Sequence, residues 1–458
     1  MYNRRWSATS LDEKPSLPQP TVGATKELGM STKLDLRNRT VPVPEPNLTP
    51  AEMIERAIAL QPRLRAEQDE TERRGVYSEA IHREFQKAGF YRCLQPRRFG
   101  GYEFDLKTYY RIGIEIARGD PSVSWCLIVG AGHALMLSSY FSEEAQADGF
   151  GPSGDFSAPS VAAPSGTATR VEGGWFVQGK WGYASGAPYA THFMPSVLLS
   201  SEAPGPPRAG IALVPRAQWK MLDDWGAILG MRGSGSNSIV IEGARVPASH
   251  VIELDMLNVD LTGGTPGFRL HGNPMYAGRC LSFFHAELVG VMVGLGYAAI
   301  DEYEHLILTK KTPYPPMQPR YLHHDYQRHL GLALGLMNAA KRLVLNAGEV
   351  YMECCRRGFE GGKPFTMEED LELFASLEHG GRLAWEAVEM LARTSSSSAA
   401  KDGERMQRYY RDASIYRSHL SAQYEMLAQR LALVHLGLDH GMSTTARGAT
   451  PKGDGEKV

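Results

Sequence analysis

The stretch from residue 166 to residue 250 constrains the fold most, because it holds the β-forming segments of a chain that elsewhere shows helical periodicity. Its first part, residues 166–186, has two short runs of β-formers on either side of Gly173-Gly174, and such a glycine pair predicts a hairpin turn. Its second part, residues 229–247, begins with a small, hydroxyl-rich loop and continues into a β-branched run at 238–241. A loop of this kind exposes backbone N–H groups to a ligand. The pattern therefore predicts a small β domain between helical domains.

Helical patterns lie on both sides of this stretch. The sequence T-P-A-E at 49–52 combines a cap residue, a proline at the first helical position and a glutamate, and predicts a helix start. Residues 105–133 predict two helices separated by G-D-P, and the second is so apolar that we expect it to be buried. Four long helical patterns predict a bundle, and they cover residues 280–310, 326–357, 367–392 and 407–438.

These patterns predict an α+β chain of several domains, as its 458 residues also suggest. Residues 262–273 are predicted as a loop, and both chain ends lack apolar periodicity. The predicted organisation is a disordered arm (1–46), an N-terminal helical domain (47–160), a central β domain (161–272), a C-terminal helical bundle (273–443) and a disordered tail (444–458).

Composition excludes several classes of partner. A formal net charge of −2 and a pI near 6.7 give no reason to expect nucleic acid or an anionic membrane surface. The best apolar run, residues 288–300, is too short to span a membrane. Five cysteines form neither a C-x-x-C pair nor an even framework, which favours a reducing, cytoplasmic setting. Adjacent Cys354 and Cys355 are predicted to be ordinary helix residues.

Two motifs suggest a ligand site only superficially. G-S-G-S-N-S at 233–238 is followed by a strand, whereas a dinucleotide fingerprint needs a helix N-terminus to receive the pyrophosphate, so we exclude a Rossmann fold. H-H-D-Y-Q-R-H at 323–329 is rich in metal-binding residue types, but its histidines are not spaced i, i+4. We interpret it as a solvated helix start and predict no metal site.

Five motifs in order resemble the acyl-CoA dehydrogenase superfamily. They are D-P-S-V-S-W (120–125), W-G-Y-A-S-G (181–186), L-G-M-R-G-S-G-S (229–236), V-P (246–247) and R-D-A (411–413), within a match over roughly residues 50–440. The resemblance implies an N-terminal helical domain, a central β-barrel and a C-terminal four-helix bundle, in a homotetramer with flavin between barrel and bundle. The independent helix, β, helix reading agrees with this implication.

Two departures from the dehydrogenases indicate a branch of the superfamily. The E-G-T motif that supplies the base of many acyl-CoA dehydrogenases is absent after R-D, and His419 occurs in that region. R-x-x-F-G is absent too, and K-K-T-P-Y-P occupies the corresponding stretch at 310–315. The chain resembles the oxygenase components of two-component flavin monooxygenases, such as the 4-hydroxyphenylacetate 3-hydroxylase group. That resemblance implies reduced FMN or FAD from a separate NAD(P)H:flavin reductase, with O2 as co-substrate and a C4a-hydroperoxyflavin as oxidant.

The same resemblance implies roles for individual residues. Ser185 would protect the N5 region of the flavin, and His133 or His419 would accept the phenol proton, since a neutral histidine can do so near physiological pH. Ser160 and Trp125 would contact the substrate, although Ser157 and Ser165 are alternatives to Ser160. A turn serine, a core histidine and an interhelical hydrogen bond are the structural alternatives for Ser185, His133 and His419. The predicted flavin contacts are Trp181, Ser185, Gly186, Arg232, Ser234, Ser236, Arg279, Ser396 and Ser397.

The predicted function is hydroxylation of a phenol or another electron-rich aromatic compound. Three alternatives stay open. They are an acyl-CoA dehydrogenase or oxidase with a displaced base, an N- or S-oxidising flavin monooxygenase on the same scaffold, and a flavin-binding regulatory protein without catalysis.

Overall fold

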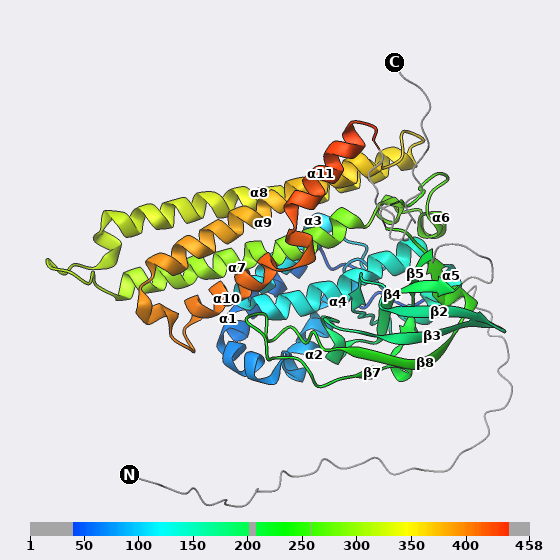
Figure 1. The fold of residues 1–458 in the computed structure, drawn as a ribbon, viewed down its shortest axis with the longest axis horizontal. Coiled ribbons are helices and arrows are strands. Elements are labelled where there is room, and N and C mark those ends of the chain that lie inside the picture. Colours follow the sequence, from blue (N-terminus) through cyan, green and yellow to red (C-terminus); the bar gives the residue numbers. More distant parts are fainter. Residues whose placement is uncertain (1–39, 201–207, 257, 439–458) are drawn as a thin grey trace, which may run out of the picture. The chain divides into compact units, whose positions relative to one another are not determined.

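A computed structural model describes residues 40–200, 208–256 and 258–438 (Figure 1). The predicted tail and residues 1–39 of the predicted arm lie outside the described residues. The last residues of the arm pair with the fold, because the Val41 N–H donates to the Arg98 carbonyl at 2.9 Å.

The N-terminal helices begin and end where capping residues lie. Thr49 and Glu52 form the predicted capping box, and Asp120 starts a helix by accepting hydrogen bonds from the backbone N–H groups of Ser122 and Val123. The helix that Asp120 starts is almost entirely buried, as predicted. The helices of this part are α1 (Pro50–Arg74), α2 (Glu79–Ala88), α3 (Leu106–Gly119), α4 (Pro121–Tyr140) and α5 (Glu143–Phe150).

The central domain is a nine-stranded mixed sheet in the order β7-β8-β3-β2-β4-β5-β9, with β1 and β6 both paired to β4. The predicted hairpin is present: β2 and β3 pair antiparallel around Gly173, whose φ of 78° needs glycine. The two end strands, β7 and β9, do not pair with each other among the described strands, so hydrogen bonding does not close a ring. The strands are β1 (Ser160–Val161), β2 (Gly166–Val171), β3 (Gly174–Trp181), β4 (His192–Ser200), β5 (Arg208–Ala212), β6 (Val214–Pro215), β7 (Lys220–Met221), β8 (Ile239–Pro247) and β9 (Val251–Glu253).

The C-terminal helices differ from the prediction at two places. The predicted loop at 262–273 contains a short helix, α6 (Pro266–His271), because Thr265 caps it. The predicted single helix at 407–438 is wrong: it breaks after Arg417 and resumes at Tyr424, with a 3-10 turn, η9 (Leu420–Ala422), in the gap. The helices are α7 (Leu281–Thr309), α8 (His324–Phe359), α9 (Met367–Thr394), α10 (Arg405–Arg417) and α11 (Tyr424–His435).

Helix α4 lies where the helical and β parts meet. It packs against α3 and α7 of the helical parts and against β1 of the sheet. Among the described residues, α4 and α7 are the two helices long and apolar enough to cross a membrane, but 94% and 89% of their most apolar windows are buried inside the fold. Their apolar faces are therefore already covered by packing.

Candidate active site

Three serine hydroxyls meet where the hairpin motif and the glycine-rich loop come together. Ser185 lies in the turn between β3 and the 3-10 helix η3 (Ala187–Tyr189), and Ser234 and Ser236 lie in the loop before β8. Oγ of Ser236 is 2.8 Å from Oγ of Ser185 and 2.7 Å from Oγ of Ser234. All three side chains are buried. The two sequence motifs thus form one hydrogen-bonded cluster.

Trp125 joins this cluster to the C-terminal bundle. Its indole Nε1–H donates to Oγ of Ser185 at 3.0 Å. The same indole meets the ring of His419 edge-on, with centroids 5.6 Å apart and an interplanar angle of 74°. Three of the predicted site residues, from three separate segments of the chain, therefore lie in consecutive contact.

The tautomer of His419 follows from its partner. His419 is the N-cap of η9, and its Nδ1 accepts the backbone N–H of Ser421 at 3.1 Å. A backbone N–H can only donate, so the proton of the neutral ring is on Nε2. Burial, with a smaller effect from His285, lowers the pKa of His419 to about 4. At neutral pH this ring is a neutral hydrogen-bond donor at Nε2.

His133 has the opposite tautomer. Its Nδ1 donates to the carbonyl of Val129 at 2.6 Å, one turn earlier on α4, which leaves Nε2 as the basic nitrogen. Burial lowers the pKa of His133 to about 4, and hydrogen bonds to the backbone of Val129 and Ala158 oppose that fall. The ring stacks on Phe284 of α7, with centroids 4.9 Å apart.

His133 and Ser160 are not in contact with the serine cluster. His133 lies eight residues after Trp125 on α4, a rise of roughly 12 Å. Ser160 is half-buried on β1, which follows Ala158, and the N–H of Ala158 donates to the Gly130 carbonyl on α4 at 2.9 Å. The segment that leads into β1 therefore runs beside the part of α4 that carries His133.

A pocket of about 260 Å³ opens on the serine cluster, and Ser236, Gly182, Tyr183 and Trp225 contribute to its lining. Tyr183 is 70% exposed and meets Trp225 edge-on, with centroids 5.7 Å apart. An exposed tyrosine and a half-buried tryptophan beside hydroxyl donors suit a planar heteroaromatic ring, so these residues fit a flavin.

Gly186 closes the turn beside this pocket. Its φ is 87°, and an added Cβ would lie 3.1 Å from the carbonyl oxygen of Cys126. Glycine therefore allows the turn and its close approach to α4.

Other predicted flavin contacts are placed elsewhere. Trp181 is fully buried in the sheet core, and its Nε1 donates to the Ser196 carbonyl at 3.0 Å, so no face is left for the flavin ring. The guanidinium of Arg279 is buried 3.6 Å from a carboxylate oxygen of Asp370, which corrects its assignment to a phosphate. Arg232 donates to the Ile228 carbonyl at 2.7 Å and pairs with Glu72 at 3.1 Å.

Ser396 and Ser397 lie at the far end of the bundle from His419. Both are exposed just after α9, and Oγ of Ser396 is 3.0 Å from Oγ of Ser398. Glu378, near the middle of α9, accepts the hydroxyl of Tyr416, three residues before His419, and it lies 18 residues before Ser396, a rise of roughly 27 Å. Within one chain these serines do not belong to the cluster around Ser185.

Sequence reasoning missed the residue that holds the glycine-rich loop. Oδ1 of Asp412 accepts the N–H of Met231 at 2.6 Å, and the neighbouring Arg411 donates to the Leu229 carbonyl at 2.8 Å. Burial raises the pKa of Asp412 to about 7. The R-D motif therefore anchors the serine loop to α10. The R-D motif can be seen in the sequence, but Met231, whose N–H binds Asp412, lies 181 residues away, so the sequence does not reveal this contact.

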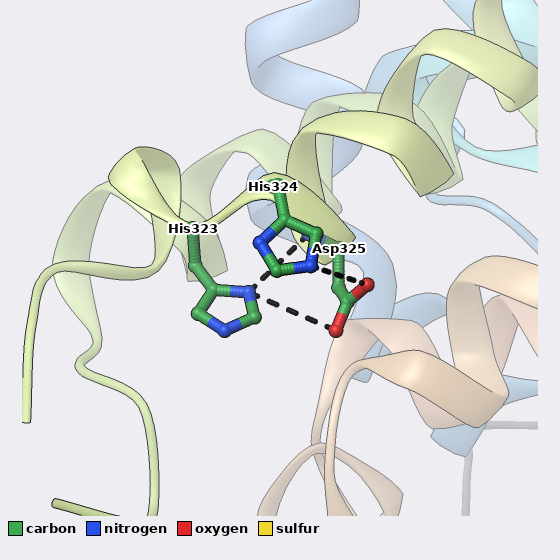
Figure 2. Close-up of side chains that lie close together, drawn as sticks. All are labelled: His323, His324 and Asp325. Atoms are coloured by element: carbon green, nitrogen blue, oxygen red, sulfur yellow. Dashed lines mark hydrogen bonds and ion pairs between the residues drawn. The ribbon is translucent and has the colours of Figure 1, made fainter. Parts of the chain in front are cut away.

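The histidine-rich segment forms a helix start, as predicted. Figure 2 shows His323, His324 and Asp325 at the beginning of α8, where Nδ1 of His323 accepts the N–H of Asp325 at 3.3 Å. Nδ1 of His323 is therefore already used as a cap, His324 is exposed and Asp325 is half-buried. A pocket of about 480 Å³ lies beside this helix start and contains none of the predicted site residues. We assign no metal ion to the histidine-rich segment.

The chain belongs to the acyl-CoA dehydrogenase superfamily. The model of the acyl-CoA dehydrogenase N-terminal domain matches residues 53–153 and that of the C-terminal domain matches residues 287–424, which together are more than half of the chain.

Several curated relatives are named as oxygenase subunits or components. The oxygenase subunit HsaA of a flavin-dependent monooxygenase from Rhodococcus jostii is 27% identical over 80% of this chain and 93% of its own. The oxygenase component of an FADH2-dependent resorcinol hydroxylase from a Rhizobium species is 24% identical over 77% of this chain and 86% of its own. The crystal structure of 3-HSA hydroxylase from a Rhodococcus species has a TM-score of 0.77 and 25% identity, and the match covers 84% of this chain and 97% of that one.

These comparisons confirm the predicted fold class, superfamily and branch. They also confirm the prediction of an oxidoreductase that uses reduced flavin. The assignment of individual site residues stays a prediction, apart from the corrections given above.

Proposed function

We propose that this protein is the oxygenase component of a two-component monooxygenase that hydroxylates a phenol. The observation that carries the proposal is Trp125, whose indole contacts both Ser185 and His419. The mechanism needs a protected flavin N5 region beside a hydrogen-bond donor, and Trp125 joins Ser185 and His419, to which we assign these two tasks.

The flavin, when bound, supplies electrons and activated oxygen to the substrate. Ser236 and Tyr183 line the pocket in which its ring would lie, and Ser185 would direct its hydroxyl at the N5 region. Burial of the serines and of Trp125 keeps water from this region.

The two histidines take opposite roles because Nδ1 of His133 donates a hydrogen bond to a carbonyl, whereas Nδ1 of His419 accepts one from a backbone N–H. Nε2 of His133 is unprotonated in the neutral ring and accepts the phenol proton, which makes the aromatic ring more electron-rich. Nε2–H of His419 donates to an oxygen atom beside the flavin site. We therefore assign the base to His133 and the donor to His419.

The partners follow from the same proposal. A separate NAD(P)H:flavin reductase would supply reduced FMN or FAD, and the protein would work in the cytoplasm as a homotetramer. The relatives named as oxygenase components support the separate reductase.

The test is stopped-flow absorbance after protein with reduced FMN or FADH2 is mixed with oxygenated buffer. We expect a species that absorbs in the near ultraviolet before oxidised flavin returns, and a hydroxylated product when a phenol is present. H133N should lose phenol hydroxylation while that species still forms. If oxidised flavin instead returned at once, stayed tightly bound and was bleached by an acyl-CoA, the dehydrogenase alternative would replace this proposal.

A further inference from the structure

A series of easily oxidised side chains begins at the serine cluster. Trp125, whose indole donates to Ser185, is followed on α4 by Cys126. The thiol of Cys126 lies beside the turn of the cluster, because an added Cβ at Gly186 would be 3.7 Å from Sγ. The same thiol is hydrogen-bonded to the hydroxyl of Tyr77. The indole, the thiol and this phenol are all buried.

Tyr77 continues the series toward the surface. Its hydroxyl is 2.8 Å from that of Tyr91, in the 3-10 helix η2 (Phe90–Arg92), and the Tyr91 hydroxyl is 2.9 Å from Nδ1 of His82 on α2. Both tyrosines are buried, whereas His82 is half-buried and stacks on the half-buried Tyr189, with centroids 4.3 Å apart. The series therefore runs from the candidate site to the protein surface.

Backbone contacts hold Tyr77 beside the serine loop. Val76 forms a β-bridge with Ser234, and the N–H of Gly235 donates to the carbonyl of Gly75 at 2.8 Å. Tyr77 is the next residue after this bridge. The contacts that fix the serine loop thus also fix the start of the tyrosine pair.

We propose that this series is an electron-transfer path out of the site, ending at a redox-active tyrosine, Tyr91, with His82 as the base that takes its proton. The path reduces a one-electron oxidant that forms in the site, namely an oxygen radical derived from peroxide such as the hydroxyl radical, before it attacks the side chains there. The proposal rests on the proposed function, because an oxygenase that uses reduced flavin releases peroxide when a turnover fails to hydroxylate.

The step transfers one electron and one proton. The hydroxyl radical takes an electron from Trp125 and leaves as hydroxide, and Tyr91 supplies the electron that restores Trp125. The O–H bond of Tyr91 breaks, and its proton passes to Nδ1 of His82. The products are hydroxide, a neutral tyrosyl radical and a protonated His82. A thiol in solution then returns one electron to the tyrosyl radical, and His82 returns the proton.

One arrangement of the hydrogen bonds satisfies all three groups and suits this step. A neutral His82 with its proton on Nε2 accepts the O–H of Tyr91 at Nδ1, and the oxygen of Tyr91 accepts the O–H of Tyr77. Burial lowers the pKa of His82 and raises the pKa of both tyrosines well above the ordinary value. The base is therefore unprotonated at neutral pH and both phenols keep their protons.

The test is low-temperature EPR of the full chain with oxidised FMN, frozen under blue light, since excited oxidised flavin removes an electron from a nearby side chain. We expect a tyrosyl radical, recognised because ring-deuterated tyrosine narrows its signal. Y91F should lose that signal and leave a tryptophan radical. H82F keeps a ring on Tyr189 but removes the base, so it should also lose the tyrosyl signal.

Two tyrosine variants are controls. Tyr351 is as buried as Tyr91, but its hydroxyl donates to the carbonyl of Arg279, so Y351F should keep the signal. Tyr183 lines the flavin pocket without belonging to the series, and Y183F should keep it too. A wild-type spectrum without a tyrosyl radical, or a tyrosyl signal that survives Y91F, would overturn the path.

Mass spectrometry tests the protective role. The protein is incubated with reduced FMN and oxygen without a phenol, and oxygen addition to Trp125 is followed by peptide mapping. It should accumulate several times faster in Y91F and H82F than in the wild type or Y351F, and equal rates would overturn the protective role. Neither measurement uses a phenol, so a wild type that fails to hydroxylate phenols would overturn the proposed function alone.

Discussion

Asp412→Asn tests how the R-D motif holds the serine loop. The carboxyl group of Asp412 is 3% exposed, and its Oδ1 accepts the Met231 N–H. Burial raises the pKa of Asp412 from 3.8 to about 7, the hydrogen bond from Met231 lowers it, and the charge of Asp120 raises it further. Asparagine keeps an acceptor oxygen for Met231 and imitates the protonated acid, so the substitution removes the ionisation and keeps the anchor.

The sign of the effect follows from linkage. A folded-state pKa above the unfolded value means that this group's contribution to stability is fully present below the unfolded pKa near 4 and is lost as the pH rises through about 7. At about 1.36 kcal/mol per pKa unit, the wild type loses about 3 kcal/mol of stability between pH 5 and pH 8 from this group. D412N has no such loss, so its stability relative to wild type should rise by that amount.

Thermal unfolding at pH 5, 6, 7 and 8 measures the difference. The Tm of D412N relative to wild type should increase by several degrees over this range. D402N is the matched control, because Asp402 is exposed just before α10, and its Tm difference should not change with pH. A Tm difference for D412N that stays constant from pH 5 to pH 8 would mean that burial does not hold the proton on Asp412, and the reasoning would be wrong.

Three other substitutions test the site. S185A removes the acceptor of the Trp125 N–H and should shorten the lifetime of the near-ultraviolet species about fivefold, the effect of about 1 kcal/mol; an unchanged lifetime in stopped flow would exclude its protective role. G186A places a Cβ in a left-handed turn against the carbonyl oxygen of Cys126 and should lower the free energy of unfolding by about 1–3 kcal/mol. Urea denaturation measures this change, and an unchanged free energy would contradict the turn geometry. W181F should lower the free energy of unfolding by about 0.5–3 kcal/mol and leave the affinity for reduced flavin unchanged in a fluorescence titration. A loss of affinity would show that Trp181 does contact the flavin.

Local chemistry explains why much of the fold could be predicted. The capping box at Thr49 and the Gly-Gly turn of the β2–β3 hairpin are decided by residues within a few positions of one another. The buried character of α4 follows from its composition alone. The break at 418–423 could not be found in this way, because the apolar periodicity of 407–438 continues through it and the interaction that stabilises it is between side chain and backbone.

Most residues of the candidate site could be predicted from the sequence, but the contacts between them could not all be predicted. Ser185, Ser236, Trp125 and His419 were all named from motifs, and the structure places them in consecutive contact. Trp181 belongs to the same motif as Ser185, but Trp181 is the last residue of β3 and its side chain enters the sheet core, whereas Ser185 lies in the turn that follows the strand. Sequence order gives no sign of which side chain faces which way.

The roles of the two histidines depend on a contact that the sequence does not carry. In a continuous helix the N–H of Ser421 would donate to the carbonyl of Arg417, four residues earlier, and both ring nitrogens of His419 would be free. The chain instead breaks, and that N–H donates to Nδ1 of His419. The break in the helix therefore sets the tautomer of His419, with a donor at Nε2, whereas the carbonyl of Val129 inside an intact helix gives His133 an acceptor at Nε2.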